Sequence, residues 1–257
     1  MLAFLAARAV EGVERVEHGR YRRTLPVGWI EVAHLPEASS LLVTGTDPAA
    51  EAGRVGALFG LEADPEATGA HLARDPLLAP LVAARPGLRV PGGWDGFEVA
   101  MRAVLGQQVS VAAARRLLGS LVRLCGGAGF PTPGRVHEAD LSLLGMPGAR
   151  RVTLRAVARA ALDDPLLFTR KGSVEETVAR LREIPGVGEW TAQYIALRAA
   201  REPDAFPASD LGLLRGAAGQ GARPTPAQLL ARAERWRPYR AYAAQHLWTE
   251  DAARMRP

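Results

Sequence analysis

A Pro-Gly-x-Gly turn lies between two stretches of helical sequence and limits the folds open to this chain more than any other segment. The turn is Pro185–Gly188, and before it Ser173 with Glu176 predicts a capped helix that ends near Arg182. A second helix is expected over residues 189–200. Two glycines let the backbone adopt positive φ and approach a partner closely. The pattern therefore predicts two helices joined by a tight hairpin.

The hairpin is also a candidate anion site. The helix after it offers unpaired N–H groups and a positive dipole end, so Gly186, Gly188 and the Thr191 hydroxyl are candidates to bind phosphate. A weaker corner of the same kind, Gly145–Gly148, lies near Arg150, which could also reach phosphate. The alternative is a helix corner with a glycine C-cap and no ligand. The flanking helices favour a DNA-backbone site, where binding weakens steeply with salt and reads no sequence.

A single carboxylate follows the hairpin. Asp210 comes 20 residues after Trp190 and directly precedes an apolar helical segment. Serine and aspartate are the usual helix N-caps, so Ser209-Asp210 on local sequence alone indicates a cap. Both roles can coexist, because a helix N-terminus helps keep a carboxylate ionised. An ionised aspartate can stabilise the positive charge that develops on a sugar when its base leaves.

The first 88 residues predict an α+β unit. Short runs rich in β-branched or aromatic residues, punctuated by glycine and proline, predict strands throughout the first 45 or so residues. The clearest strands are Arg20–Leu25, Trp29–His34 and Leu41–Thr46, and helices are expected at Ala49–Leu58 and Pro65–Arg74. We expect an antiparallel sheet with helices on one face over residues 1–88.

From Trp94 onward the sequence predicts helices only. Asp95 with Glu98 predicts a capping box at the first of them. Further boundaries are marked by Ser110 and Gly126, by Pro147-Gly148, by Thr225 with Gln228, and by Pro238 in a first turn. Proline and glycine cluster over residues 86–91, so we expect a helical domain over 89–257. Its subdomains, about 89–203 and 204–257, would flank a cleft.

Composition limits the kinds of partner this chain can bind and the cellular compartment it suits. The net charge of +5 favours a polyanionic partner, although Lys171 is the only lysine among the 32 basic residues, which is also typical of GC-rich coding. Cys125 is the only cysteine, which excludes an internal disulfide, a cysteine-based zinc site and an iron–sulfur cluster, and suits a reducing cytoplasm. Neither a membrane span nor a signal peptide is expected, because apolar runs are short and Met1–Arg8 has no basic region before its apolar run.

Together these segments resemble the helix-hairpin-helix DNA glycosylase superfamily, and most closely the bacterial 3-methyladenine DNA glycosylase II type. The likeness extends over nearly the whole chain, through Phe4–Val10, Ala83–Arg89, Arg102–Ala112, Leu144–Pro147, Ala233–Arg240 and His246–Trp248, besides the hairpin and Asp210. It implies an enzyme that flips a damaged nucleotide out of double-stranded DNA and hydrolyses its N-glycosidic bond. We expect a cytoplasmic, nucleoid-associated monomer that requires no cofactor.

The resemblance also assigns roles to residues of this sequence. Asp210 is implied to be the catalytic carboxylate, and Gln107 and Gln108 fall on the loop that wedges into the duplex. The base pocket is implied to contain Trp190, Tyr194, Trp248, Phe4 and Leu211. In relatives the hairpin can hold a structural monovalent cation through backbone carbonyls, here those of Arg182, Ile184 and Val187.

Several positions depart from the family pattern. Gln108 stands where an aliphatic wedge is usual, and Leu211 and Thr249 stand where tyrosines occur, which predicts a more open pocket. Trp190 stands where bifunctional relatives carry a Schiff-base lysine, and Lys171 precedes the whole hairpin unit, so no lysine-based lyase activity is expected. The sequence therefore predicts a monofunctional glycosylase for 3-methyladenine and related methylated purines, with alkylated pyrimidines as further candidates. A glycosylase for oxidised or deaminated bases and a non-catalytic module that binds damaged DNA stay open as alternatives.

Overall fold

The N-terminal part of the structure is a short helix followed by a four-stranded antiparallel sheet. In the computed structural model, which describes residues 1–219 and 221–255, these elements are α1 (Leu2–Arg8), β1 (Glu14–Glu17), β2 (Arg20–Thr24), β3 (Trp29–Leu35) and β4 (Ser40–Gly45). The strands pair in the order β1-β2-β3-β4. The three predicted strands and the antiparallel sheet are confirmed. The prediction of strands throughout this region is wrong at α1, where leucine, alanine and arginine favour a helix.

One face of the sheet is buried under helices. Tyr21 pairs with Val32 and Arg23 with Ile30 across β2 and β3, and all four side chains are buried. Because side chains alternate along a strand, these four point to the same face. Helices α1 and α2 (Pro48–Phe59) pack on that face and complete its apolar cluster.

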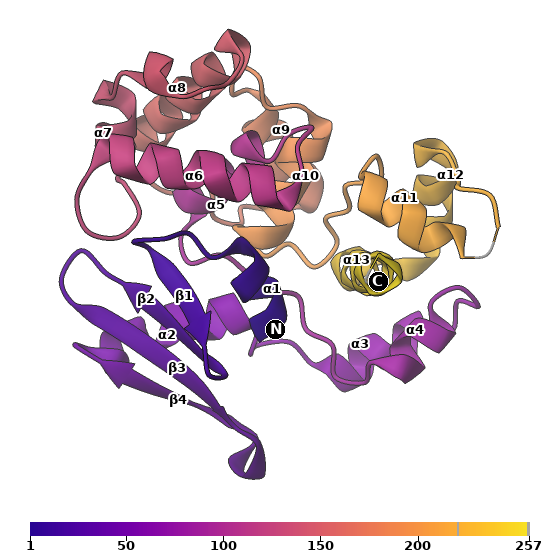
Figure 1. The fold of residues 1–257 in the computed structure, drawn as a ribbon. Coiled ribbons are helices and arrows are strands. Elements are labelled where there is room, and N and C mark those ends of the chain that lie inside the picture. Colours follow the sequence, from indigo (N-terminus) through magenta and orange to yellow (C-terminus); the bar gives the residue numbers. More distant parts are fainter. Residues whose placement is uncertain (220, 256–257) are drawn as a thin grey trace.

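Among the described residues after α2, all regular elements are helices, as predicted for the chain from Trp94 onward and for the helix at Pro65; the sequence does not predict the helix at Ala79. The helices are α3 (Pro65–Leu72), α4 (Ala79–Ala84), α5 (Gly96–Leu105), α6 (Val111–Cys125), α7 (Pro133–Glu138), α8 (Gly148–Asp163), α9 (Val174–Arg182), α10 (Glu189–Arg198), α11 (Leu211–Ala218), α12 (Pro226–Ala233) and α13 (Arg240–Arg254). Figure 1 shows α5 to α10 as one group and α11 to α13 as another, and a single apolar core includes residues of both. Within the described residues, no helix is both long and apolar enough to cross a bilayer.

Helices α3 and α4 lie beside the C-terminal helices and away from the sheet (Figure 1). Asp75 forms an ion pair with Arg232 at 2.8 Å, and Arg85 forms one with Glu250 at 2.9 Å. Leu72 belongs to the large helical core and not to the apolar cluster of the sheet. The division at residues 88 and 89 stays a prediction, but these two helices, which it groups with the sheet, contact the helical part.

Most predicted helix starts are present. Ser173 and Glu176 form both halves of a capping box on α9, and Thr225 and Gln228 do the same on α12. Pro238 does not lie in a first turn, because α13 begins two residues after it. Local side-chain chemistry is enough to fix the first two boundaries, since the capping groups lie within one turn of the helix they begin.

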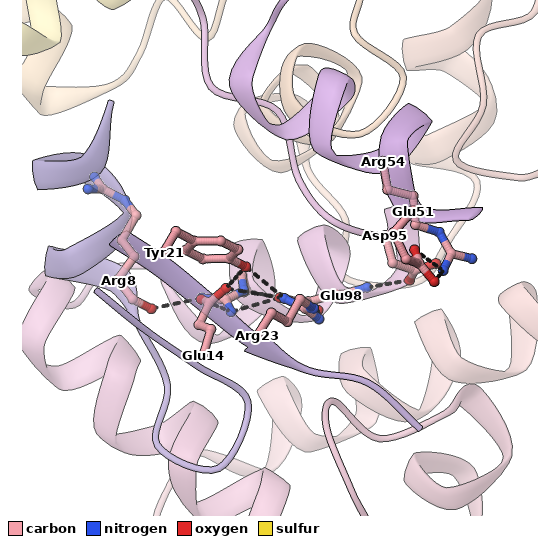
Figure 2. Close-up of polar contacts among 9 residues, drawn as sticks. Arg8, Glu14, Tyr21, Arg23, Glu51, Arg54, Asp95 and Glu98 are labelled. Atoms are coloured by element: carbon pink, nitrogen blue, oxygen red, sulfur yellow. Dashed lines mark hydrogen bonds and ion pairs between the residues drawn. The ribbon is translucent and has the colours of Figure 1, made fainter. Parts of the chain in front are cut away.

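A buried ion network joins the sheet to α5 (Figure 2). Arg23 pairs with Glu98 and lies 3.1 Å from Glu14, and Arg102 bonds to both carboxylates at 2.7 Å. Because the Glu98 carboxylate pairs with these arginines, only one hydrogen bond of the predicted capping box forms, from the Glu98 backbone N–H to the Asp95 side chain. Burial alone would raise the pKa of the Glu98 carboxyl, but the two guanidiniums hold that pKa below its usual range.

Candidate active site

Asp210 begins helix α11 and caps it. Its Oδ1 accepts hydrogen bonds from the backbone N–H of Gly212 at 2.8 Å and of Leu213 at 3.1 Å. Such a cap satisfies donors that would otherwise lack a partner in the first turn. The capping role indicated by the local sequence is therefore present. It uses one carboxylate oxygen and leaves Oδ2 for other contacts.

Two indole N–H groups also donate to Asp210. Trp190 Nε1 lies 2.9 Å from Oδ2, and Trp248 Nε1 lies 2.8 Å from Oδ1. Oδ1 thus accepts three hydrogen bonds and Oδ2 only one, so Oδ2 keeps acceptor capacity that can face a reacting group. Hydrogen bonds to a carboxylate are among the stronger ones in proteins, and four of them fix its orientation. The sequence predicts stacking for these indoles and gives no sign of this second task.

The aromatic residues implied for a base pocket come together beside Asp210. Trp190 and Tyr194 share one face of α10, with ring centroids 5.4 Å apart and planes at 19°. Trp248 on α13 meets the Tyr194 ring edge-on at 6.2 Å. Leu211 is 59% exposed and borders solvent. We call the rings of Trp190, Tyr194, Trp248 and Phe4 the aromatic layer.

Phe4 joins this layer from α1, next to two arginines that the sequence does not single out. The Cζ atom of Arg198 lies 4.8 Å from the ring centroid of Phe4, 5.6 Å from that of Tyr194 and 5.0 Å from that of Trp248. The Cζ atom of Arg8 lies 3.9 Å from the Phe4 centroid. Burial would raise the pKa of the Tyr194 hydroxyl, but the Arg198 and Arg8 guanidiniums bring it below its usual value. In a chain rich in arginine, no local pattern distinguishes these two.

The hairpin between α9 and α10 has the predicted form. Gly186 has a φ of +83°, which favours glycine, and a Cβ there would lie 1.9 Å from Oγ1 of Thr153 on α8. The turn therefore packs closely on α8. Gly188 is the N-cap of α10 and provides no side-chain cap, so the first N–H groups of α10 lack that partner.

Side chains that the sequence predicts to bind DNA form hydrogen bonds between the predicted wedge loop and its neighbours at the hairpin and on α8. Gln107 Nε2 donates to Thr191 Oγ1 at 2.9 Å and to the Gly186 carbonyl at 3.5 Å, and Arg150 donates to the Gln107 carbonyl at 2.7 Å. Thr191 is only 3% exposed, so its hydroxyl meets Gln107 and is largely shielded from solvent. Gln108 is exposed, with a φ of +56° that few residues other than glycine adopt. These contacts fix the position of the loop that presents Gln108.

The hairpin carbonyls are where a monovalent cation is expected. The Ile184 carbonyl accepts a hydrogen bond from the Val187 N–H at 3.0 Å, and the Arg182 side chain pairs with Glu189 at 3.1 Å. Over residues 1–219 and 221–255, no three His, Cys, Asp or Glu side chains are grouped so as to hold a metal ion. A cation at the hairpin would therefore depend on backbone oxygens.

Known proteins resemble this chain over nearly its whole length. The AlkA N-terminal domain family matches residues 1–95. DNA-3-methyladenine glycosylase 2 of Escherichia coli (strain K12) is 41% identical over 268 aligned residues, which cover 96% of this chain and 92% of that protein.

Solved structures share the fold. The 3-methyladenine DNA-glycosylase from Archaeoglobus fulgidus matches with a TM-score of 0.83 and 22% identity, over 98% of this chain and 93% of that one. The Schizosaccharomyces pombe 3-methyladenine DNA glycosylase, in complex with abasic DNA, matches with a TM-score of 0.62 and 26% identity, over 71% of this chain and 95% of that one. These matches confirm the predicted fold class, an antiparallel sheet followed by a helical helix-hairpin-helix region.

Proposed function

We infer that this chain, which belongs to the DNA-3-methyladenine glycosylase 2 family, excises alkylated bases from DNA in base excision repair. The observation that carries the proposal is the Asp210 carboxylate, held by two indole N–H groups beside the aromatic layer. Its substrates are 3-methyladenine and related methylated purines, with alkylated pyrimidines as further candidates.

Asp210 supports the departure of the base electrostatically. When the N-glycosidic bond breaks, its electron pair leaves with the base and positive charge develops on the sugar. Oδ2 of Asp210, which accepts only one hydrogen bond, is the oxygen available to stabilise that charge. Water then adds to C1′ and loses a proton, and the products are an abasic site and the free base.

The flipped base lies against the aromatic layer. Stacking contributes about 1–3 kcal/mol per base, which offsets the few kcal/mol that extrusion from the duplex costs. Leu211 is 59% exposed beside Asp210 and stands where relatives can carry a tyrosine, so the smaller side chain favours a pocket that accepts bases of different shape.

Double-stranded DNA is gripped at the hairpin. The N–H groups at Gly186 and Gly188 hold a phosphate at the start of α10, and Gln108 fills the gap left by the flipped nucleotide. Gln107, Thr191 and Arg150 support the loop that carries it. A monovalent cation on the carbonyls of Arg182, Ile184 and Val187 stiffens the turn, and no other cofactor is required. The enzyme acts as a monomer on the nucleoid in the cytoplasm.

The enzyme is monofunctional. A lyase of this superfamily attacks the sugar with a lysine, and Trp190 stands at that position with its indole N–H on Asp210. Lys171, the only lysine, pairs instead with Asp164 at 3.5 Å. Cleavage therefore stops at the abasic site, and strand scission is left to another enzyme.

A base-release assay tests the proposal. Duplexes that contain 3-methyladenine, hypoxanthine or 8-oxoguanine are incubated with wild-type protein and with Asp210→Asn. We expect release of the methylated base, no strand cleavage, and loss of release in the variant. Preferential release of hypoxanthine or 8-oxoguanine would identify a deaminated-base or oxidised-base glycosylase. Tight binding of lesion DNA without any release would identify a binding module.

A further inference from the structure

Arg198 is a buried cation that forms no ion pair with a carboxylate in the part of the chain that the structure describes. It is 4% exposed, its Nη1 donates to the Pro91 carbonyl at 2.7 Å, and its Nη2 donates to Gln245 Oε1 at 3.0 Å. Its buried Nε has no hydrogen-bond partner within the described part of the chain. Other buried arginines, such as Arg23 and Arg240, pair with carboxylates. A buried charge without a counter-ion is costly, and such groups concentrate at functional sites.

The guanidinium of Arg198 lies against the aromatic layer. Its Cζ atom is 5.0 Å from the ring centroid of Trp248, whose indole N–H donates to Asp210 at 2.8 Å. It also lies over the rings of Phe4 and Tyr194. The same layer of rings therefore meets an anion at one edge and a cation at its faces.

Arg8 adds a second positive charge next to the aromatic layer. Its carbonyl oxygen accepts a hydrogen bond from Arg102 at 2.9 Å, while its guanidinium points away from the buried acidic residues (Figure 2). That guanidinium lies over Phe4 and pairs with no carboxylate among the residues that the structure describes. Burial lowers the pKa of Arg198 to about 10, and repulsion from Arg8 acts in the same direction. Two mutually repelling cations thus lie against the aromatic layer.

We propose that Arg198 and Arg8 form a fixed positive charge on the base side of the N-glycosidic bond and stabilise the electron pair as it moves onto the departing base. This inference rests on the proposed function, because it assumes that the aromatic layer receives the base. Asp210 stabilises the positive charge that forms on the sugar, and the two arginines stabilise the negative charge that moves onto the base. In this step the C1′–N bond breaks and its electron pair stays with the base; the water that then adds to C1′ and loses a proton completes the hydrolysis.

The arrangement has a specific kinetic consequence for a cationic base such as 7-methylguanine. The arginines repel the bound base in the ground state, and this repulsion disappears as the base leaves neutral. They therefore weaken binding and accelerate cleavage. A group that only holds the fold together would affect both quantities in the unfavourable direction when removed.

Single-turnover kinetics on a duplex with one 7-methylguanine tests this, with Arg8→Met as the main variant. Among the described residues, the Arg8 side chain hydrogen-bonds only within its own helix, at 3.4 Å to the Phe4 carbonyl, so we expect the fold to tolerate its loss. We expect the maximal release rate to fall about tenfold, as for one partly screened charge, while the duplex binds about two- to fivefold more tightly. Arg198→Met should show a larger effect of the same kind, and Arg198→Lys should retain most of the rate.

Arg74→Met is the matched control, because Arg74 is exposed at the end of α3 and its loss changes the net charge equally. It should match wild type in rate and bind slightly more weakly. An unchanged release rate in Arg8→Met, or a lower rate with weaker binding, overturns the proposal. Absence of release by wild-type protein would instead refute the proposed function, and this inference with it.

Discussion

Replacement of Asp210 by asparagine separates the catalytic and structural tasks of this side chain. Asparagine has one oxygen, and three donors converge on Oδ1: the N–H groups of Gly212 and Leu213 and the indole of Trp248. The amide oxygen should take that position, so the cap of α11 is kept. The amide nitrogen then faces the Trp190 indole, where two donors meet at about the 2.9 Å now observed between Nε1 and Oδ2.

The two expected losses differ in size. A unit negative charge ~4 Å from the forming sugar cation is worth roughly 4 kcal/mol at an effective dielectric of ~20, so the release rate should fall about a thousandfold. A fully buried hydrogen-bond donor that loses its acceptor lowers the free energy of unfolding by about 1–3 kcal/mol. Trp190 is only partly buried, so the free energy of unfolding should fall by about 1 kcal/mol.

A second substitution isolates the stranded donor. Trp190→Phe removes the indole N–H, so Asp210→Asn made in that background should leave the unfolding free energy nearly unchanged and still abolish release. Urea unfolding followed by circular dichroism measures stability, and single-turnover release from a methylated duplex measures activity. Retention of more than a tenth of the wild-type rate by Asp210→Asn would refute the electrostatic role. An equal stability loss in both backgrounds would refute the account of the Trp190 contact.

Three further predictions concern positions around the site. Gln107→Met removes the hydrogen bond to Thr191. The extent of base flipping, measured by 2-aminopurine fluorescence, should fall about tenfold, while the affinity for undamaged duplex changes less than twofold. An equal loss of both would mean that Gln107 binds DNA directly. Gly212→Ala places a Cβ 3.0 Å from Cδ1 of Trp248 and should lower release about tenfold, and an unchanged rate would show that the indole can shift freely. Because the pKa of Glu98 is lowered by folding, its carboxylate stabilises the protein at neutral pH and this contribution is lost on acidification. The difference in unfolding free energy between wild type and Glu98→Gln should therefore shrink below the ordinary pKa range of glutamic acid, and a constant difference would contradict the ion-pair account.

Features set by near neighbours in the chain are the ones the sequence predicts well. The Ser173 capping box joins residues three positions apart, and β2, β3 and β4 pair with the strand that comes next in the chain. Predictions fail where a distant partner competes for a side chain. Glu98 has the spacing of a capping box, yet its carboxylate bonds to Arg23, 75 residues away, because a buried charge gains more from a cation than from a backbone N–H.

Local sequence is enough to predict the fold class, the hairpin turn and the N-cap at Asp210, because glycine conformations, helix caps and residue periodicity depend on neighbouring residues. The groups that surround that carboxylate, in contrast, come together only when the chain folds. Trp190 and Trp248 come from different helices and reach Asp210 across 20 and 38 residues of chain. Arg198, at the end of α10, meets Phe4 of α1 only in the folded chain, whereas Arg8 lies one helical turn from Phe4 on α1 itself. The charge balance of a buried site depends on which distant groups share its low-dielectric surroundings, and no spacing along the chain encodes that.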